Sequence, residues 1–358
     1  MDRDIVRKRI RAVRRELDKK KIRFLLVTKP ANVTYMTGFL GDDSWAAIAN
    51  GRAYLLTDSR YTEQAEKECP SCKIIDRDGP MAEAVAGLVK KLKSIRTVAV
   101  EDSVSLVDFE QLKKNVKARF RTAAGIIETV RSVKDKSEIA TIRSAVAIST
   151  KALAQTLPEI KPGVTESELA GMLDFQIRKL EARNSFETIV AFGPNGSRPH
   201  HQPGKRKLRK KDAVLIDFGA SCCGYCSDIT RCFVVGGMTA FYKKVYDAVE
   251  QAQAAAIKTI KPGVNIKQVD AAAREVIDKA NLPVYGHGTG HGFGLEIHES
   301  PFLKPDGKGK LKTGQVVTIE PGIYMPGKLG VRIEDDILVT ETGHKILTRR
   351  CPHAPFLP

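Results

Sequence analysis

The sequence lacks any run of eighteen or more apolar residues, so it predicts no membrane-spanning helix. Its first residues are charged, in place of the apolar stretch of a secretory signal, and we therefore expect a cytoplasmic protein with no membrane partner. Cysteine is scarce: the seven cysteines form an odd, scattered set that is typical of a reducing compartment. The 358 residues are 42% hydrophobic, which suffices for two domains with separate cores.

Aromatic residues are also few, at 6%, and this bears on the strongly basic charge of the chain. The net charge is +17, and much of it lies in the first 24 residues and in residues 205–211. A basic protein is a candidate for nucleic-acid binding. Single-strand readers, however, interleave aromatic side chains with their cations, and neither basic segment does so. We therefore interpret the charge as a solvated basic surface and do not expect a nucleic-acid partner.

Two cysteine pairs have the CxxC spacing, Cys69 with Cys72 and Cys223 with Cys226. Such pairs bind zinc or carry out redox chemistry in some proteins. The two pairs lie in different parts of the chain, and neither has the sequence context of a zinc ribbon. We expect ordinary thiols at these positions.

The first 125 residues alternate between strand and helix patterns. The pair Asn50-Gly51 predicts a tight hairpin turn between strands at 46–50 and 52–57. Further strands are expected at 23–28 and 97–101, and helices from about Tyr61 and over 107–116. We expect an α/β domain over residues 1–125 and a second domain over residues 126–358.

A pentapeptide, IKPGV, occurs at residues 160–164 and again at residues 260–264. Each copy is followed by a pair with the spacing of a capping box at a helix start, Thr165 with Glu168 and Asn265 with Gln268. The apolar positions that follow keep the same helical register in both copies. The matched pattern predicts an internal repeat in two large copies, rather than two unrelated helix-ending turns.

Two aspartates interrupt apolar strand patterns in the first copy. Asp217 lies in VLIDFG, and Asp228 follows in CSDITR. A hairpin with its tip at Cys222 and Cys223 would place the two carboxylates directly opposite each other, with Cβ atoms about 4.5–5.5 Å apart. Carboxylates that close in apolar strands repel each other and lose hydration, so we expect a cation between them.

The second copy has a matching pair of glutamates. Glu320 in VTIEPG and Glu334 in VRIEDD stand at equal separations from Gly327 in the turn MPGKL, so we expect them to be cross-strand neighbours. A segment rich in glycine and histidine, HGTGHGFGLEIHE, lies at 287–299. Four carboxylates and an imidazole suit two divalent ions such as Mn²⁺ or Co²⁺. A metal-free ion-pair network would need more buried cations than the two arginines in these strands.

Taken together, IDFGA, GYCSDITR, HGTGHGFGLEIHE, TIEPGIY and VRIEDD resemble the motifs of the pita-bread metallopeptidases. NVTYMTGF (32–39) and LLTDSRYTEQA (55–65) resemble the creatinase/prolidase N-terminal domain. The resemblance is closest to the Xaa-Pro aminopeptidases (aminopeptidase P) and the Xaa-Pro dipeptidases (prolidases). It implies the fold class α/β plus α+β, with an N-terminal creatinase/prolidase-like α/β domain followed by a pita-bread domain with an internal pseudo-twofold repeat.

The resemblance also implies roles for individual residues. Glu320 would handle the proton of the attacking water, and His298 and His200 would steady the scissile carbonyl or the oxyanion. His201, beside His200, is expected to be exposed. The implied metal ligands are Asp217, Asp228, His291, Glu320 and Glu334, and the implied substrate contacts are His287, Tyr324 and Arg332.

The implied reaction is attack of a metal-held hydroxide on the amide of peptides with proline in the second position, which releases the N-terminal residue. Two divalent ions are implied, Mn²⁺ first, with Co²⁺ and Zn²⁺ as alternatives, and a homodimer is expected. One alternative is a prolidase restricted to dipeptides. Further alternatives are a methionine aminopeptidase-like enzyme, a creatinase, which works without metal, and a non-enzymatic binding member of the fold.

Overall fold

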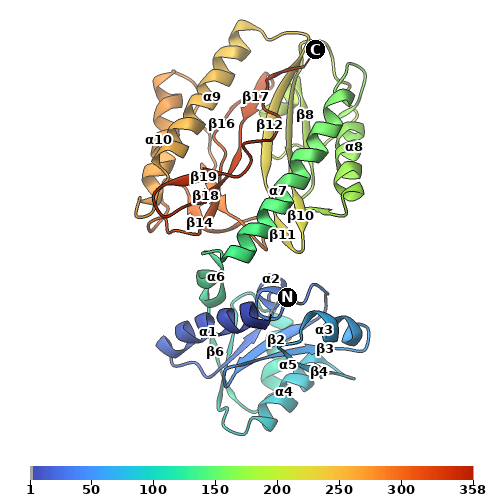
Figure 1. Cartoon of the computed structure of the whole chain (residues 1–358), viewed down its shortest axis with the longest axis vertical. Helices are drawn as coiled ribbons and strands as arrows, with labels where there is room; N and C mark the ends of the chain where they lie inside the picture. Colours follow the sequence, from blue (N-terminus) through green and yellow to red (C-terminus); the bar gives the residue numbers. More distant parts are fainter. Residues whose placement is uncertain (1–2, 358) are drawn as a thin grey trace. The chain divides into compact units, whose positions relative to one another are not determined.

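The computed structural model describes residues 3–357 and divides the chain into two compact units, Met1–Arg131 and Ser132–Pro358 (Figure 1). The boundary expected at residue 125 falls just before helix α6 (Ile126–Arg131), which belongs to the first unit because it packs against α1 and α2. Throughout the described residues, each helix is too short or too polar to cross a membrane.

A six-stranded mixed sheet forms the centre of the first unit, in the order β4-β3-β2-β1-β5-β6. Strand β2 is antiparallel to both of its neighbours, and the other strand pairs are parallel. Asn50 and Gly51 join β2 to β3 with φ values of 50° and 73°, as a tight hairpin turn requires, so the predicted hairpin is confirmed. The strands are β1 (Phe24–Val27), β2 (Trp45–Ala49), β3 (Arg52–Thr57), β4 (Lys73–Asp76), β5 (Thr97–Val100) and β6 (Arg119–Thr122).

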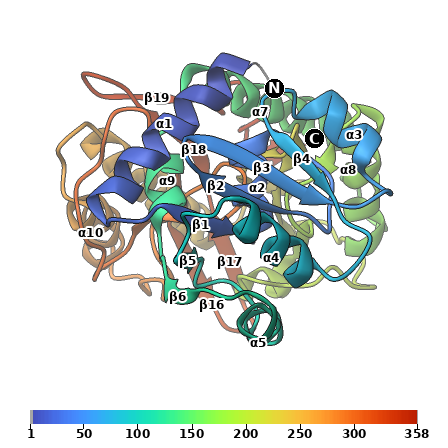
Figure 2. The same cartoon turned by 90° about the horizontal axis from the view of Figure 1, so that it is seen from below.

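Helices cover both faces of this sheet, with α1 on one side and α4 and α5 on the other (Figure 2). The basic first helix is amphipathic: Val6, Ile10, Val13 and Leu17 are buried, and most of its cations face solvent. Much of the N-terminal charge therefore belongs to the outer face of a packed helix. Besides α6, the helices of this unit are α1 (Arg3–Lys19), α2 (Pro30–Thr37), α3 (Thr62–Glu68), α4 (Met81–Lys91) and α5 (Leu106–Asn115).

The second unit has strands between two pairs of helices (Figure 1). The first pair, α7 (Lys136–Thr156) and α8 (Glu166–Lys179), flanks the first IKPGV copy, and α9 (Ala240–Thr259) and α10 (Ile266–Lys279) flank the second. Both predicted capping boxes, at the starts of α8 and α10, are confirmed. Helices α7 and α8 pack on β8, β9 and β12, and α9 and α10 pack on strands of the second half.

Over residues 132–357, the strands of the second unit form four sheets, β20-β12-β9-β8, β14-β13-β15-β18-β19, β11-β10-β7 and β16-β17. The first half supplies β7 (Arg183–Asn184), β8 (Ile189–Phe192), β9 (Ala213–Phe218), β10 (Ala220–Cys222), β11 (Tyr225–Cys226) and β12 (Ile229–Val235). The second half supplies β13 (Gly290–Gly292), β14 (Glu299–Leu303), β15 (Val316–Ile319), β16 (Gly322–Met325), β17 (Leu329–Arg332), β18 (Asp335–Val339), β19 (His344–Ile346) and β20 (Phe356–Leu357).

The two IKPGV copies make the same backbone hydrogen bonds. In each copy the glycine N–H donates to a leucine carbonyl in a later loop, and the N–H of that leucine donates back to the valine of the pentapeptide. The distances are 2.9 and 2.8 Å for Gly163, Leu208 and Val164, and 2.9 and 2.9 Å for Gly263, Leu311 and Val264. The predicted internal repeat is therefore confirmed in the backbone itself.

The repeated glycines adopt φ values of 101° at Gly163 and 85° at Gly263, which side chains strongly disfavour. We expect Gly163→Ala and Gly263→Ala each to lower the free energy of unfolding by about 1 kcal/mol. Gly171→Ala is the matched control, because Gly171 lies exposed inside α8 and its new Cβ would meet no atom within 4 Å. It should raise the free energy of unfolding by about 0.5–1 kcal/mol. Urea unfolding measures the stability of all three variants. Equal losses of stability in all three would contradict the argument from positive φ.

Candidate metal centre

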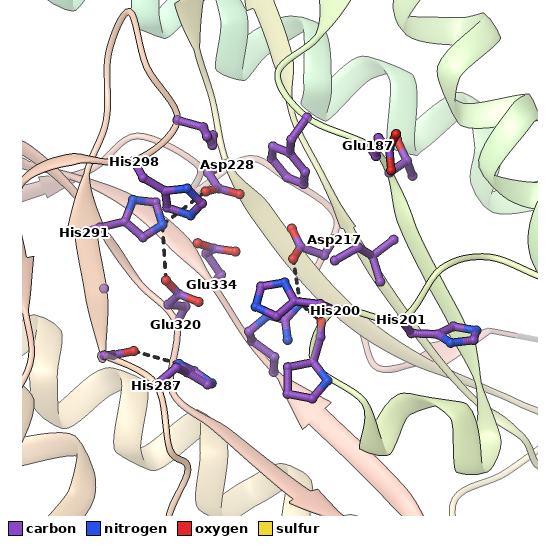
Figure 3. Close-up of a pocket in the computed structure, with 18 of the residues that line it drawn as sticks. Glu187, His200, His201, Asp217, Asp228, His287, His291, His298, Glu320 and Glu334 are labelled. Atoms are coloured by element: carbon purple, nitrogen blue, oxygen red, sulfur yellow. Dashed lines mark hydrogen bonds and ion pairs between the residues drawn. The ribbon is translucent and has the colours of Figure 1, made fainter. Parts of the chain in front are cut away.

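A pocket of about 480 Å³ is lined by residues from both halves of the second unit (Figure 3). Its lining contains every site residue selected from the sequence except Tyr324. The lining members of that set are Asp217, Asp228, His291, Glu320, Glu334, His200, His298, His287 and Arg332. Residues far apart in the chain thus meet around one cavity.

The hairpin that carries the aspartates has a different tip from the one expected. Cys223 and Gly224 form the turn, with φ values of 48° and 83°, and Cys222 pairs with Tyr225. In this register Asp217 lies opposite Thr230, so the prediction that it directly faces Asp228 was wrong. A tight turn needs positive φ at both central residues, and Gly224 provides this freely at the second. Asp228 remains on the same face, two residues along, as a diagonal neighbour of Asp217.

The glutamates do have the register expected from the sequence. Ile319 lies opposite Asp335 and Gly322 lies opposite Arg332, so the intervening positions place Glu320 opposite Glu334. The prediction that these glutamates are cross-strand neighbours is confirmed.

His291 presents one ring nitrogen to the acids. Its Nδ1 donates to the carbonyl oxygen of Gly292 at 3.1 Å, which leaves Nε2 facing the pocket. Nε2 lies 3.3 Å from Glu320 Oε1 and 3.5 Å from Asp228 Oδ2. Ligand atoms of Asp228, His291 and Glu334 all lie within 4.8 Å of one another. A metal-binding imidazole is oriented in this way, with its second nitrogen held by a backbone carbonyl.

Burial makes this collection of acids costly. It raises the pKa of Asp228 and of Glu334 well above the usual range, and neighbouring carboxylates reinforce the rise. Burial also raises the pKa of Asp217, although the Arg332 guanidinium opposes this. Burial alone would raise the pKa of Glu320, but His291, together with His287 and Arg332, outweighs it and lowers this pKa to about 2.

The donor set fits divalent cations. Asp217 Oδ1 is buried and has no hydrogen-bond partner among residues 3–357, so one carboxylate oxygen has an open coordination position. Carboxylate oxygens with a single imidazole suit hard or borderline ions such as Mn²⁺. A bound cation would also relieve the repulsion that raises the pKa values of Asp228 and Glu334.

Arg332 and Tyr324 connect the acids to His287. Buried Arg332 donates from Nη2 to Asp217 Oδ2 at 2.6 Å and from Nη1 to the Tyr324 hydroxyl at 2.8 Å. His287 Nδ1 donates to the carbonyl of Gly288 at 2.7 Å, so its Nε2 accepts the Tyr324 O–H at 3.0 Å. Burial lowers the pKa of His287, which favours this neutral ring. Tyr324 therefore lies behind the lining and holds His287 and Arg332 in place.

Thr230 was missed by the sequence reasoning. Its hydroxyl donates to Glu334 Oε2 at 2.7 Å and accepts from Arg332 Nε at 3.1 Å. It therefore links acids of both halves, because it is also the cross-strand partner of Asp217. Its position two residues after Asp228, on the same strand face, was the available signal.

The histidines at the pocket differ in their surroundings. The ring of His298 packs edge-on against that of His291, with 4.4 Å between the ring centres, and His200 lies exposed beside Asp217 (Figure 3). The prediction that His201 is exposed was wrong. His201 is buried, and its Nε2 lies 2.9 Å from Glu166 Oε2, whose carboxylate also accepts from backbone and amide N–H groups.

Several other lining residues gave no signal in the sequence. Phe186, Ile189 and Ile297 form apolar parts of the wall, and Glu187 and Lys304 are charged. Ile297 stands inside the glycine- and histidine-rich segment 287–299, but the other four lie in ordinary strand or loop patterns, and only the fold brings them to the cavity.

Comparisons with known proteins agree with this geometry. A model of metallopeptidase family M24 matches residues 140–341, and one of the Creatinase/Prolidase N-terminal domain matches residues 9–133. The chain is 38% identical over 334 residues to the uncharacterised peptidase YqhT of Bacillus subtilis, covering 92% of this chain and 94% of the relative.

Two solved structures share the whole architecture. The Xaa-Pro dipeptidase from Bacillus anthracis has a TM-score of 0.94 at 37% identity, covering 98% of this chain and 100% of that chain. The X-Pro aminopeptidase from Thermotoga maritima has a TM-score of 0.89 at 35% identity, covering 96% and 100%.

Proposed function

Because this chain belongs to metallopeptidase family M24 and is a peptidase, we propose that it removes the N-terminal residue from peptides with proline in the second position. Family membership also confirms the expected fold class, a creatinase/prolidase N-terminal domain followed by a pita-bread domain. The observation that carries the proposal is the set of buried acids around His291 in a pocket large enough for a peptide end.

The family implies divalent metal ions, and this pocket is their proposed site. We propose that two ions, Mn²⁺ first, with Co²⁺ and Zn²⁺ as alternatives, are held by Asp217, Asp228, His291, Glu320 and Glu334. When bound, such ions supply a water that is deprotonated near neutral pH and polarise the scissile carbonyl.

Glu320 is the proposed proton carrier. Its carboxylate lines the catalytic pocket beside His291, where it can accept the proton of the attacking water. It can then return that proton to the leaving nitrogen, which must be protonated before it departs.

His298 and His200 are the proposed partners of the carbonyl oxygen. Burial lowers the pKa of His298, so its ring is neutral at physiological pH and offers one N–H donor. His200 lies across the pocket beside Asp217 and can approach the same oxygen from the other half. Donors that meet the developing oxyanion lower the barrier. We assign substrate contact to His287 and Arg332, held by Tyr324.

Proline in the second position suits this arrangement. The Xaa-Pro bond has no N–H, so a site that depends on that donor cannot bind it. None of the proposed contacts uses it: they act on the carbonyl, the water and the leaving nitrogen. Phe186, Ile189 and Ile297 form apolar parts of the wall, against which uncharged side chains can pack.

A second candidate function is a dipeptidase restricted to Xaa-Pro dipeptides, favoured by the likeness to the Bacillus anthracis Xaa-Pro dipeptidase. Hydrolysis assays with the Mn²⁺-loaded protein distinguish the candidate functions. The substrates are Ala-Pro, Ala-Pro-Ala-Ala, Ala-Ala-Ala-Ala, Met-Ala-Ala-Ala and creatine. We expect Ala-Pro-Ala-Ala to be cleaved at least about tenfold faster than Ala-Ala-Ala-Ala. Equal rates would instead favour a methionine aminopeptidase-like enzyme, and cleavage of Ala-Pro alone would favour the dipeptidase.

The homodimer and the cytoplasmic location expected from the sequence stay predictions. Light scattering at micromolar concentration tests the dimer, and a monomer there would contradict it.

A further inference from the structure

A second pocket, of about 460 Å³, lies beside the catalytic pocket and is formed mainly by residues 300–315. The two pockets share Phe302 and Lys304 in their linings, so they meet at these residues. Both side chains are exposed, with Phe302 at 44%. A peptide that extends beyond the catalytic pocket past these two side chains would therefore reach the second pocket.

This second pocket, which we call the lysine groove, is lined by Lys304, Lys308, Lys310 and Lys312. Its one acidic lining residue is Asp306, whose Oδ1 lies 3.4 Å from the Lys304 ammonium. Within residues 3–357, the ammonium groups of the other three lysines have no ionic partner. The groove therefore carries an uncompensated positive charge directly beside the site of hydrolysis.

The catalytic pocket itself has an acidic end and a basic end. Exposed Glu187 lies on one side of the acid cluster and His287 on the other (Figure 3). Gly288 follows His287, and a Cβ placed on it would lie 3.4 Å from the Cβ of Lys304. Lys304 is thus at the His287 end. Charge complementarity directs the N-terminal ammonium of a peptide toward Glu187 and its carboxyl-terminal part toward Lys304.

We propose that the lysine groove binds acidic side chains that follow the proline of a longer peptide. The inference rests on the proposed Xaa-Pro cleavage and deepens it, because it names the substrate class as Xaa-Pro peptides with Asp or Glu after the proline. The contacts are exposed charge pairs, so they are individually weak and sensitive to salt. They act mainly on substrate binding.

The test compares Ala-Pro-Glu-Glu with its neutral isostere Ala-Pro-Gln-Gln, using the full-length, metal-loaded protein. We expect a kcat/KM about fivefold higher for the acidic peptide, mostly through KM, as suits two or three screened charge pairs. The preference should shrink as the salt concentration rises from about 0.05 to about 0.5 M, because screening shortens the reach of surface charges. The double variant Lys308→Gln/Lys310→Gln should reduce the preference to less than about twofold.

The internal repeat supplies a matched control. Lys310 bridges Asn265 in the second half as Lys207 bridges Thr165 in the first. Lys205→Gln/Lys207→Gln therefore removes the same charge at equivalent exposed positions that line neither pocket. This variant should keep the full preference for the acidic peptide.

The outcomes separate the groove from the proposed function. Cleavage of Ala-Pro with equal kcat/KM for the two tetrapeptides overturns the groove proposal alone. Loss of the preference in both double variants also overturns it, because net charge would then be the cause. Cleavage of Ala-Pro with no cleavage of either tetrapeptide overturns the groove and leaves the dipeptidase function standing. Failure to cleave any Xaa-Pro peptide overturns both.

Discussion

Exhaustive removal of divalent ions is expected to abolish hydrolysis of Ala-Pro substrates, and added Mn²⁺ to restore it. The pocket concentrates Asp228, Glu334 and Glu320 around a single imidazole, and the unpartnered oxygen of Asp217 adds a further donor. Without the ions, no proposed group lowers the pKa of water toward neutral, so Glu320 would have no readily ionised water to act on. Full activity in demetallated protein, with metal content checked by mass spectrometry, would contradict the proposed mechanism.

Metal binding should also appear in stability, independently of activity. A ligand that binds only the folded state stabilises it by about 2.7 kcal/mol at a hundred times its Kd. We expect Mn²⁺ to raise the unfolding midpoint of the wild type and to have much less effect on Glu334→Gln. Without metal, Glu334→Gln should be at least as stable as the wild type, because it removes one of the acids that repel each other. Glu187→Gln is the control, since this exposed acid lies away from the cluster and should leave the Mn²⁺ effect intact.

Glu320→Gln is expected to lower kcat on Ala-Pro substrates by at least about 10³. The change keeps the size of the side chain but removes both a ligand charge and the proposed proton carrier. His298→Ala should lose about 10²–10³ in kcat and retain its metal, because it removes only an oxyanion donor. Steady-state kinetics of both variants, with their metal content measured, shows whether Glu320→Gln loses more kcat than His298→Ala. A Glu320→Gln enzyme with full metal and nearly wild-type kcat would exclude Glu320 as the proton carrier.

The sequence predicted correctly those parts of the site that depend on residues close together in the chain. The register of Glu320 and Glu334 follows from equal distances to Gly327, and the capping boxes follow from spacing alone. The hairpin of Asp217 turns at Cys223 and Gly224, one residue later than the predicted tip at Cys222 and Cys223. The glycine at 224 was the better guide, since it takes φ of 83° freely in the turn.

The remaining wrong or missing predictions involve contacts between residues that are far apart in the sequence. His201 is buried because Glu166, far away in the sequence, presents a buried carboxylate to it. No periodicity or motif near His201 carries that information. Thr230 and Lys304 are likewise ordinary residues in their own segments, and they reach the pocket only because the two halves bring their strands and loops together.

The repeated architecture has a consequence for how the protein matures. On the proposed ligand set, the half that is synthesised first contributes only Asp217 and Asp228, and the half that follows contributes His291 and both glutamates. Neither half alone offers an ion the complete ring of donors. On that ligand set we expect tight ion binding only when both halves have folded together, because Asp228 of the first half and His291 and Glu334 of the second surround the same position.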